Sequence, residues 1–171
     1  MKKLNREFER MVEAHKAPVY SVCYMYAKDR EEADDMFQEV LINLWNGFKS
    51  FRGLTDSNRS GRGNDRVSRS WVYRVALNTC ISYKRKKRIK TEPLEIAPEI
   101  FDVDSPTGRQ TEALHHRITH LDPLDRAIVL LWLEDMPYEE IGAIVGMTAK
   151  NVGVRLIRIK EKLKKIHNDE N

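Results

Sequence analysis

The stretch Ser70–Lys90, SWVYRVALNTCISYKRKKRIK, passes within one helix length from an apolar, aromatic pattern to six basic residues in seven positions. In its first half Trp71 and Val75 share a helical face with Asn78 or Thr79, so this half must pack against other helices. The cations that follow cannot be buried unpaired. The fold must therefore leave this end open to solvent or to an acidic ligand.

Positive charge is concentrated around this stretch, although the formal net charge of the 171 residues is only +4. Residues 51–90 carry 12 basic and 2 acidic residues, whereas residues 91–120 carry 2 basic and 6 acidic ones. Residues 1–50 and 121–171 each carry 8 basic and 9 acidic residues. This distribution is more typical of a phosphate-binding face than of a general solubilising surface.

Other features exclude several classes of protein. No run approaches eighteen apolar residues, and the N-terminus continues into an amphipathic segment rather than a signal-peptide core, so we expect a cytoplasmic protein without membrane insertion. Cys23 and Cys80 are far apart in sequence and form no CxxC motif, which indicates reduced thiols on apolar helix faces. His116 and His120 have zinc-ligand spacing but no third ligand, which favours helix-surface histidines. We expect no metal or other cofactor.

The first fifty residues predict two or three helices. Apolar residues from Phe8 to Tyr26 have helical spacing, and Pro18 within this run predicts a kink or a break into two helices. Asp29 is a candidate N-cap for a following helix, with Glu32 in the capping-box position. This helix has an apolar stripe, which comprises Ala33, Met36, Phe37, Val40, Leu41, Leu44 and Trp45.

The opposite face of that helix presents Asp34, Asp35, Gln38 and Glu39. Three interpretations are open from these residues alone. The face can be simply solvated, it can hold a divalent cation between carboxylates, or it can dock a basic partner helix. The cation is the weakest of the three, because no glycine-bearing loop or histidine cluster lies nearby in the sequence.

Two segments interrupt the helical pattern. Residues 52–69 combine three glycines with five arginines and predict an exposed loop, whose arginines either contact phosphates or keep it solvated. Residues 91–111 contain three prolines and an acidic balance, which indicates a linker. The expected fold is all-α, with helical domains at 1–90 and 112–171 joined by this linker.

The last sixty residues predict a helix-turn-helix. Asp122 is a candidate N-cap before Pro123, and Pro137 opens a short helix that ends at a glycine. The turn Gly146–Thr148 leads to another helix that Thr148 caps, and the small Gly142 lies where the two helices approach. The buried face of this last helix is expected to comprise Val152, Leu156, Ile159, Leu163 and Ile166.

The outward positions of the last helix are Lys150, Asn151, Gly153, Val154, Arg155, Arg158, Lys162 and Lys165. A recognition helix uses its N-terminal half for bases and its basic flank for phosphates. This favours Asn151, Val154, Arg155 and Arg158 as major-groove contacts. On the earlier basic helix, Tyr73 and Tyr83 flank Asn78 and suit either stacking on unpaired bases or packing in the core.

Several segments in this order resemble the extracytoplasmic-function group of the sigma-70 family of bacterial RNA polymerase sigma factors. The segments are DDMFQEVLINLW, SWVYRVALNTCISYKRK, the acidic linker and LDPLDRAIVLLWLEDMPYEEIGAIVGMTAKNVGVRLIRIKEKL. The resemblance implies a non-enzymatic protein that binds core polymerase, recognises the −35 promoter element with its C-terminal domain and opens DNA at the −10 element with its N-terminal one.

The resemblance also implies roles for individual residues. Asp35, Gln38 and Glu39 match a D-x-x-Q-E motif that contacts the clamp helices of the polymerase β′ subunit, which favours docking for the acidic face. Asn78 matches the −10 strand position, and its expected DNA-contacting neighbours are Tyr83, Lys84, Arg85, Lys86, Lys87 and Arg88. The expected −35 contacts are Thr148, Lys150, Asn151, Val154, Arg155 and Arg158. The polymerase β flap and an anti-sigma factor are further expected partners.

Two departures from the family pattern stand out. The expanded, arginine-rich segment 52–69 predicts altered or more phosphate-dependent −10 recognition. Gly153 and Val154 stand where the family often has a basic residue and a serine, so family −35 sequences do not transfer. Two rival classes remain: a dimeric helix-turn-helix regulator that never binds polymerase, and a metal-dependent nuclease built on Asp34, Asp35 and Glu39.

Overall fold

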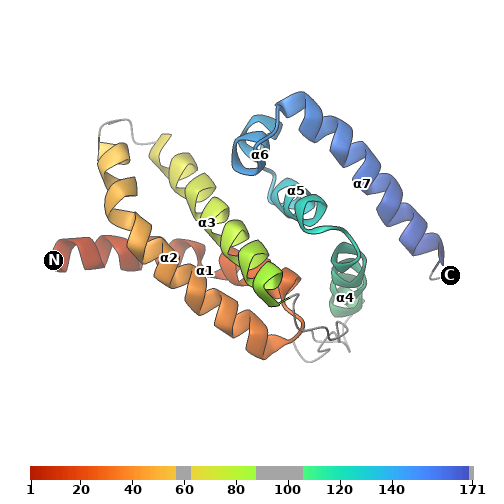
Figure 1. Ribbon diagram of the computed structural model, residues 1–171, viewed down its shortest axis with the longest axis horizontal. Helices are drawn as coiled ribbons and strands as arrows, with labels where there is room; N and C mark the ends of the chain where they lie inside the picture. Colours follow the sequence, from red (N-terminus) through yellow and green to blue (C-terminus); the bar gives the residue numbers. More distant parts are fainter. Residues whose placement is uncertain (57–62, 88–105, 170–171) are drawn as a thin grey trace. The chain divides into compact units, whose positions relative to one another are not determined.

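The protein is all-α, as the sequence predicts. In the computed structural model, residues 1–56, 63–87 and 106–169 are described, and these contain seven helices and no strand (Figure 1). The chain divides into two compact units, Met1–Pro93 and Leu94–Asn171. Within the described residues, no helix is long and apolar enough to cross a membrane.

The first unit is a bundle of three helices, α1 (Lys2–Tyr26), α2 (Arg30–Asp56) and α3 (Gly63–Lys87), each of which packs against the other two (Figure 1). Apolar side chains spaced three and four residues apart form its core, as expected for amphipathic helices. The fully buried members include Val19, Val22, Cys23, Ala33, Met36, Val40, Leu44, Val72, Ala76, Leu77 and Cys80.

The helix α1 is continuous through Pro18, so of the two expected alternatives, a kink or a break into two helices, the break is wrong. An interior proline costs about 3 kcal/mol through its missing N–H and its clash with the preceding turn. Val19, Val22 and Cys23 are all buried just beyond it. Burial of a large apolar side chain contributes about 1.5–3 kcal/mol, so tertiary packing beyond Pro18 outweighs the local cost.

The start of α2 has the expected cap. Asp29 Oδ1 accepts a hydrogen bond from the N–H of Glu32 at 2.8 Å. The reciprocal bond of a capping box is displaced by one residue, because the Glu32 carboxylate accepts from the N–H of Lys28 at 2.6 Å. The first interaction satisfies a donor that a helix start otherwise leaves open, and the second holds the residue before the cap.

The loop expected at 52–69 is shorter than the sequence indicated. The helix α2 continues to Asp56 and α3 begins at Gly63, so the remaining connection, 57–62, lies outside the described residues. Contacts from the neighbouring turns support these extensions: the ring of Phe51 stacks on Trp71 with centroids 4.4 Å apart. Arg52 also pairs with Glu7 of α1, with Nε 2.8 Å from Oε2.

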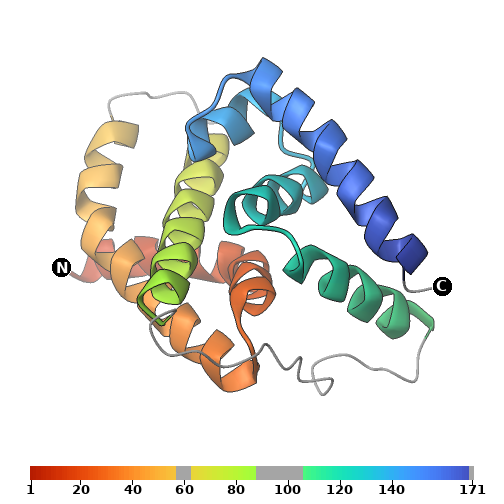
Figure 2. The ribbon, with the colours of Figure 1, turned by 45° about the vertical axis from the view of Figure 1, so that its right-hand side comes forward.

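The second unit contains α4 (Pro106–Thr119), α5 (Pro123–Leu133), α6 (Tyr138–Val145) and α7 (Ala149–Asp169) (Figure 2). The last six positions of the linker expected at 91–111 are therefore helical, and the linker before them lies outside the described residues. Proline is favoured at a helix start, which accounts for the beginning of α4. The core of this unit includes Ile118, Leu121, Ala127, Ile128, Leu131, Ile141, Val152, Leu156 and Ile159.

The two cysteines are free and buried, as expected, and the structure adds that they meet between α1 and α3. The Cys80 thiol lies 3.8 Å from Cys23 Sγ and donates a hydrogen bond to it. This hydrogen bond and burial raise the pKa of Cys80 far above its ordinary value. Both thiols are therefore apolar packing groups.

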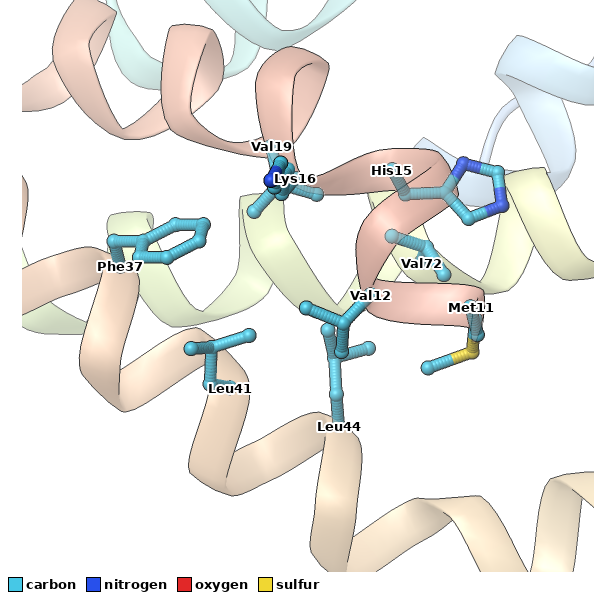
Figure 3. Close-up of a pocket in the computed structure, with 9 residues that line it drawn as sticks. All are labelled: Met11, Val12, His15, Lys16, Val19, Phe37, Leu41, Leu44 and Val72. Atoms are coloured by element: carbon cyan, nitrogen blue, oxygen red, sulfur yellow. The ribbon is translucent and has the colours of Figure 1, made fainter. Parts of the chain in front are cut away.

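A small hollow lies between α1 and α2, with Val72 of α3 at its base (Figure 3). Apart from His15 and Lys16 its lining is apolar, with residues such as Phe37 and Leu44. Binding sites for small molecules combine an apolar cavity with convergent polar groups. This hollow lacks such a set and belongs to the packing of the bundle.

Candidate functional site

The acidic face of α2 is open to solvent. Asp34, Asp35 and Gln38 are exposed and Glu39 is half-buried, while the opposite side of the helix packs in the core. The Asp34 carboxylate is engaged with α1, because the Tyr20 hydroxyl donates to its Oδ1 at 2.7 Å. Burial and this bond raise the pKa of Tyr20. Asp35, Gln38 and Glu39 therefore form the part of the face that is available to a partner.

Apolar side chains extend this face along α2. Ile42 is 59% exposed and Trp45 is 41% exposed. Trp45 was expected in the apolar core stripe; its ring instead packs edge-on against Phe8, with centroids 5.0 Å apart, and stays partly exposed. Exposed aliphatic and aromatic groups beside carboxylates are typical of protein interfaces rather than of a solvated helix face.

In the middle of α3, the structure shows which polar and aromatic residues are exposed and which are buried, a choice that the sequence left open. Asn78 is exposed, whereas Thr79 is buried and its Oγ1 accepts a hydrogen bond from Asn43 Nδ2 at 3.0 Å. Tyr73 is 2% exposed and belongs to the core, while Tyr83 is half-buried. Asn78 is therefore the polar side chain that α3 presents to solvent at this level.

The described cations at the basic end of α3 are of two kinds, one paired with a buried acid and the others exposed. Lys84 Nζ lies 3.1 Å from Oε2 of Glu32, a carboxylate whose side chain is only 2% exposed. Arg85 and Lys86 are exposed. The side chains of Lys87 and Arg88 lie outside the described residues. Lys84 thus neutralises a buried acid of α2, and the exposed charge begins one residue later.

The expected helix-turn-helix is formed by α6 and α7, which follow each other through a short turn (Figure 2). Gly146 has the left-handed φ of 79°, and the Gly142 carbonyl accepts from the N–H groups of Gly146 and Met147 at 2.8 and 2.9 Å. A Cβ on Gly142 would lie 2.4 Å from the Met147 carbonyl oxygen, so only glycine allows this close approach. Thr148 Oγ1 caps α7 by accepting from the N–H of Asn151 at 3.2 Å.

The outer surface of α7 carries most of the side chains expected there. Those exposed to solvent, together with the cap before the helix, are Thr148, Lys150, Asn151, Val154, Arg158, Lys162 and Lys165. Gly153 is half-buried and lies beside the ring of Tyr138. Leu163 and Ile166, expected on the buried face, are half-buried.

Arg155 differs from the other expected base contacts. Its Nε donates to Oδ1 of Asp125 at 2.5 Å, and its Nη2 lies 3.7 Å from Oδ2 of Asp122. Lys162 Nζ lies 3.0 Å from the other oxygen of Asp125. Sequence reasoning missed this cluster, because the partners of Asp125 lie 30 and 37 residues away along the chain.

The Asp125 side chain is 2% exposed and is an acid buried by the fold. Burial raises the pKa of this carboxyl, but the hydrogen bonds from Arg155 and Lys162 outweigh that effect and leave the pKa below its ordinary value. The same interaction raises the pKa of Arg155. The carboxylate is thus ionised at neutral pH and is paired on both oxygens.

Metal ligation finds no support among the side chains that are described. The rings of His116 and His120 lie 4.5 Å apart, but no group of three or more His, Cys, Asp or Glu in this part of the chain could hold an ion. Asp34, Asp35 and Glu39 on the acidic face of α2 belong to this part of the chain and form no such group.

These features define a helical protein in which a bundle with an open acidic face and a basic helix end accompanies a helix-turn-helix unit. Family models agree in both parts of the chain: sigma-70 region 2 matches residues 11–89, and sigma-70 region 4 matches residues 111–163. The chain belongs to the sigma-70 family of RNA polymerase sigma factors, in its extracytoplasmic-function group.

Similar proteins carry the same group name. The chain is 27% identical to the ECF RNA polymerase sigma factor SigW of Bacillus subtilis, with 92% of this chain and 87% of that protein covered. It is 25% identical to the ECF RNA polymerase sigma factor SigE of Mycolicibacterium smegmatis, over 92% of this chain but only 60% of that longer protein.

Solved structures share the fold. The sigma factor RpoE from Bartonella quintana, crystallised with the anti-sigma factor NepR, superposes with a TM-score of 0.68 and 18% identity over the whole of both chains. CnrH, in complex with the cytosolic domain of CnrY, gives a TM-score of 0.66 at 18% identity, with 98% of this chain and 91% of CnrH covered.

Proposed function

We propose that this sigma factor binds core RNA polymerase through α2, directs it to promoters whose −35 element α7 contacts, and promotes DNA opening at the −10 element with α3. Residues 1–90 would form the polymerase-binding and −10 part, and residues 112–171 the −35 part. The observation that carries the proposal is the presence of both sigma-70 regions in order, each with its expected polar face exposed.

Polymerase docking is assigned to Asp35, Gln38 and Glu39. Carboxylates on an exposed helix suit a basic partner such as the β′ clamp helices, and charge complementarity of this kind speeds association. The neighbouring Ile42 adds exposed apolar area that a partner would bury. The rival interpretations, a solvated face or a divalent cation site, account for neither the exposed isoleucine nor the family match.

Contact with the −10 element is assigned to Asn78 and the exposed cations of α3. Arg85 and Lys86 are positioned to neutralise backbone phosphates, while the Asn78 amide can pair with the edge of an unstacked base. Extrusion of a base costs a few kcal/mol, and its capture by the protein offsets part of that cost. The protein itself makes or breaks no covalent bond in this scheme; the polymerase performs the chemistry.

Contact with the −35 element is assigned to the N-terminal half of α7. In a helix-turn-helix this part of the second helix lies in the major groove. Asn151 can donate to and accept from a base edge, and Val154 can contact a thymine methyl group. Lys150 and Arg158 supply charge for bases or phosphates, and Thr148 caps the helix at the same end.

Further partners follow from the same assignment. The polymerase β flap is the expected contact of the second unit. An anti-sigma factor is the expected regulator, because the sigma factor RpoE from Bartonella quintana was crystallised with the anti-sigma factor NepR. The working compartment would be the cytoplasm, where core polymerase acts. A helix-turn-helix regulator that acts without polymerase is not favoured, because it would not need sigma-70 region 2.

A pull-down with core polymerase tests the docking face. Glu39→Lys reverses one charge of the proposed contact and is expected to weaken binding by at least about tenfold, or about 1.4 kcal/mol. Glu9→Lys makes the same charge change at an exposed position of α1 and should leave binding within about twofold. Failure of the wild-type chain to bind core polymerase would overturn the proposed function, and equal effects of the two variants would remove the docking assignment.

A further inference from the structure

A buried carboxylate ties the recognition helix to the rest of its unit. Asp125 lies in the first turn of α5, where its N–H is already used by the Asp122 cap at 2.8 Å. Its side chain is 2% exposed, and each of its two oxygens accepts from a cation of α7. An acid buried in this way requires its partners, because an unpaired buried charge is strongly destabilising.

The two cations are spaced to fix the orientation of α7. Arg155 and Lys162 are seven residues apart, which places them on the same side of the helix and about two turns from each other. On another side of the same helix, the Lys160 ammonium lies 4.4 Å from the ring centroid of Trp132, also on α5. Contacts on two sides limit rotation of α7 about its own axis.

The same contacts direct Arg155 away from the side of α7 that is most exposed. Val154 and Arg158 are exposed at the centre of that side, whereas Arg155 is half-buried at its edge. Its guanidinium is engaged at Nε by Asp125, with Asp122 nearby. A guanidinium held at Nε by a carboxylate cannot offer its Nε–Nη pair of donors to a guanine.

We propose that Asp125 is a positioning residue for −35 recognition, which fixes the rotation of α7 through Arg155 and Lys162, and that Arg155 itself selects no base. Base selection then falls to Asn151, Val154 and Arg158. This inference rests on the proposed function and corrects one −35 contact that the sequence predicted. It reassigns Arg155 from the group of base contacts to the framework that supports them.

The experiment uses the full chain bound to core polymerase and a promoter library randomised in the −35 element. Arg155→Ala and Asp125→Asn are compared with Arg158→Ala, an exposed arginine of the same helix. For each variant, base preference at every library position and the dependence of promoter binding on salt are measured. Thermal unfolding of each variant identifies any that fails to fold, and Lys162→Ala provides a milder disruption of the same cluster.

Arg155→Ala and Asp125→Asn should each weaken binding to all promoters by a similar factor of about 3–10, with base preferences retained. The double variant Arg155→Ala, Asp125→Asn should bind promoters little more weakly than either single variant, because both substitutions remove the same interaction. Lys162→Ala should show a smaller effect of the same uniform kind. Arg158→Ala should instead relax preference at a base position or lower the salt slope by about 0.9.

Three results would overturn the inference: relaxed base preference in Arg155→Ala, a salt slope lowered as in Arg158→Ala, or unchanged promoter binding in both Arg155→Ala and Asp125→Asn. None of these would affect the proposed function. If the wild-type complex with core polymerase selected no promoter sequence at all, the proposed function itself would fail, whatever the variants did.

Discussion

Two buried carboxylates, Glu32 and Asp125, determine whether the cations next to them are available to bind a ligand. Each has a side chain that is 2% exposed and each pairs with a cation on a helix assigned to DNA. Lys84 and Arg155 occupy outward helical positions in the sequence, yet both pair with these acids. A count of the cations at outward helical positions therefore overestimates the number that face a ligand.

The pH dependence of stability should reveal the Asp125 cluster. A carboxyl whose pKa is lowered by folding stabilises the protein above its ordinary pKa of about 4, and this contribution is lost as the pH falls through the folded value. Asp125→Asn should lower the free energy of unfolding by about 1–2 kcal/mol at pH 7, after allowance for the partly exposed partners.

Urea unfolding of wild type and Asp125→Asn at pH 7, 5 and 3 measures this contribution. The difference between the two proteins should be unchanged from pH 7 to pH 5 and should shrink below about pH 4. A difference that stayed constant down to pH 3 would show that the carboxylate is not what stabilises the cluster.

At the scale of elements, the turn between α6 and α7 depends on one glycine. Alanine in place of glycine normally stabilises a helix by about 1 kcal/mol. At Gly142, however, the added Cβ would lie 2.4 Å from a backbone oxygen of the turn, and backbone must move to admit it. Gly142→Ala should therefore destabilise the protein by about 1–3 kcal/mol.

Gly153→Ala is the matched control for that substitution. A Cβ at Gly153 would meet the Tyr138 ring at 3.4 Å, an ordinary contact, so this change should be neutral or slightly stabilising. Thermal unfolding followed by circular dichroism compares the two variants. Equal melting temperatures would contradict the close approach of α6 to the turn.

Helix boundaries were predictable where a cap or a turn marks them, and not elsewhere. Asp29, Asp122 and Thr148 all cap the helices that the sequence assigned to them. The ends of α2 and α3 near 52–69 were missed, since glycines and arginines there break the apolar period. The Phe51–Trp71 stack next to this segment joins residues 20 positions apart, which local pattern cannot indicate.

At the scale of the whole molecule, acidic and basic residues are assigned to different partners. The acidic residues of α2 are assigned to a basic protein partner, and the excess of positive charge in 51–90, 12 basic against 2 acidic, to nucleic acid. Opposite charges on separate helices allow one small protein to bind partners of opposite sign. The net charge of +4 hides this division.

The salt dependence of binding to the −10 element tests this assignment of charges to different partners. With core polymerase and a promoter whose −10 strand is unpaired, Arg85→Ala and Lys86→Ala should each lower the slope of log affinity against log salt by about 0.7. Lys84→Ala removes the same charge from a lysine already paired with Glu32 and should lower the slope less. A larger effect for Lys84→Ala than for Arg85→Ala would refute the distinction between the two kinds of cation.

The sequence by itself determined the helical class, the helix-turn-helix and its caps, and the family, because these depend on local periodicity, turn chemistry and ordered motifs. Only the tertiary structure decided that α1 runs through Pro18, that Trp45 stays partly exposed, and that Lys84 and Arg155 serve buried acids. These outcomes depend on side chains brought together from distant positions. A buried carboxylate pairs with a nearby cation even where the helical period assigns that cation to the exposed surface, since an unpaired charge in the interior is costly.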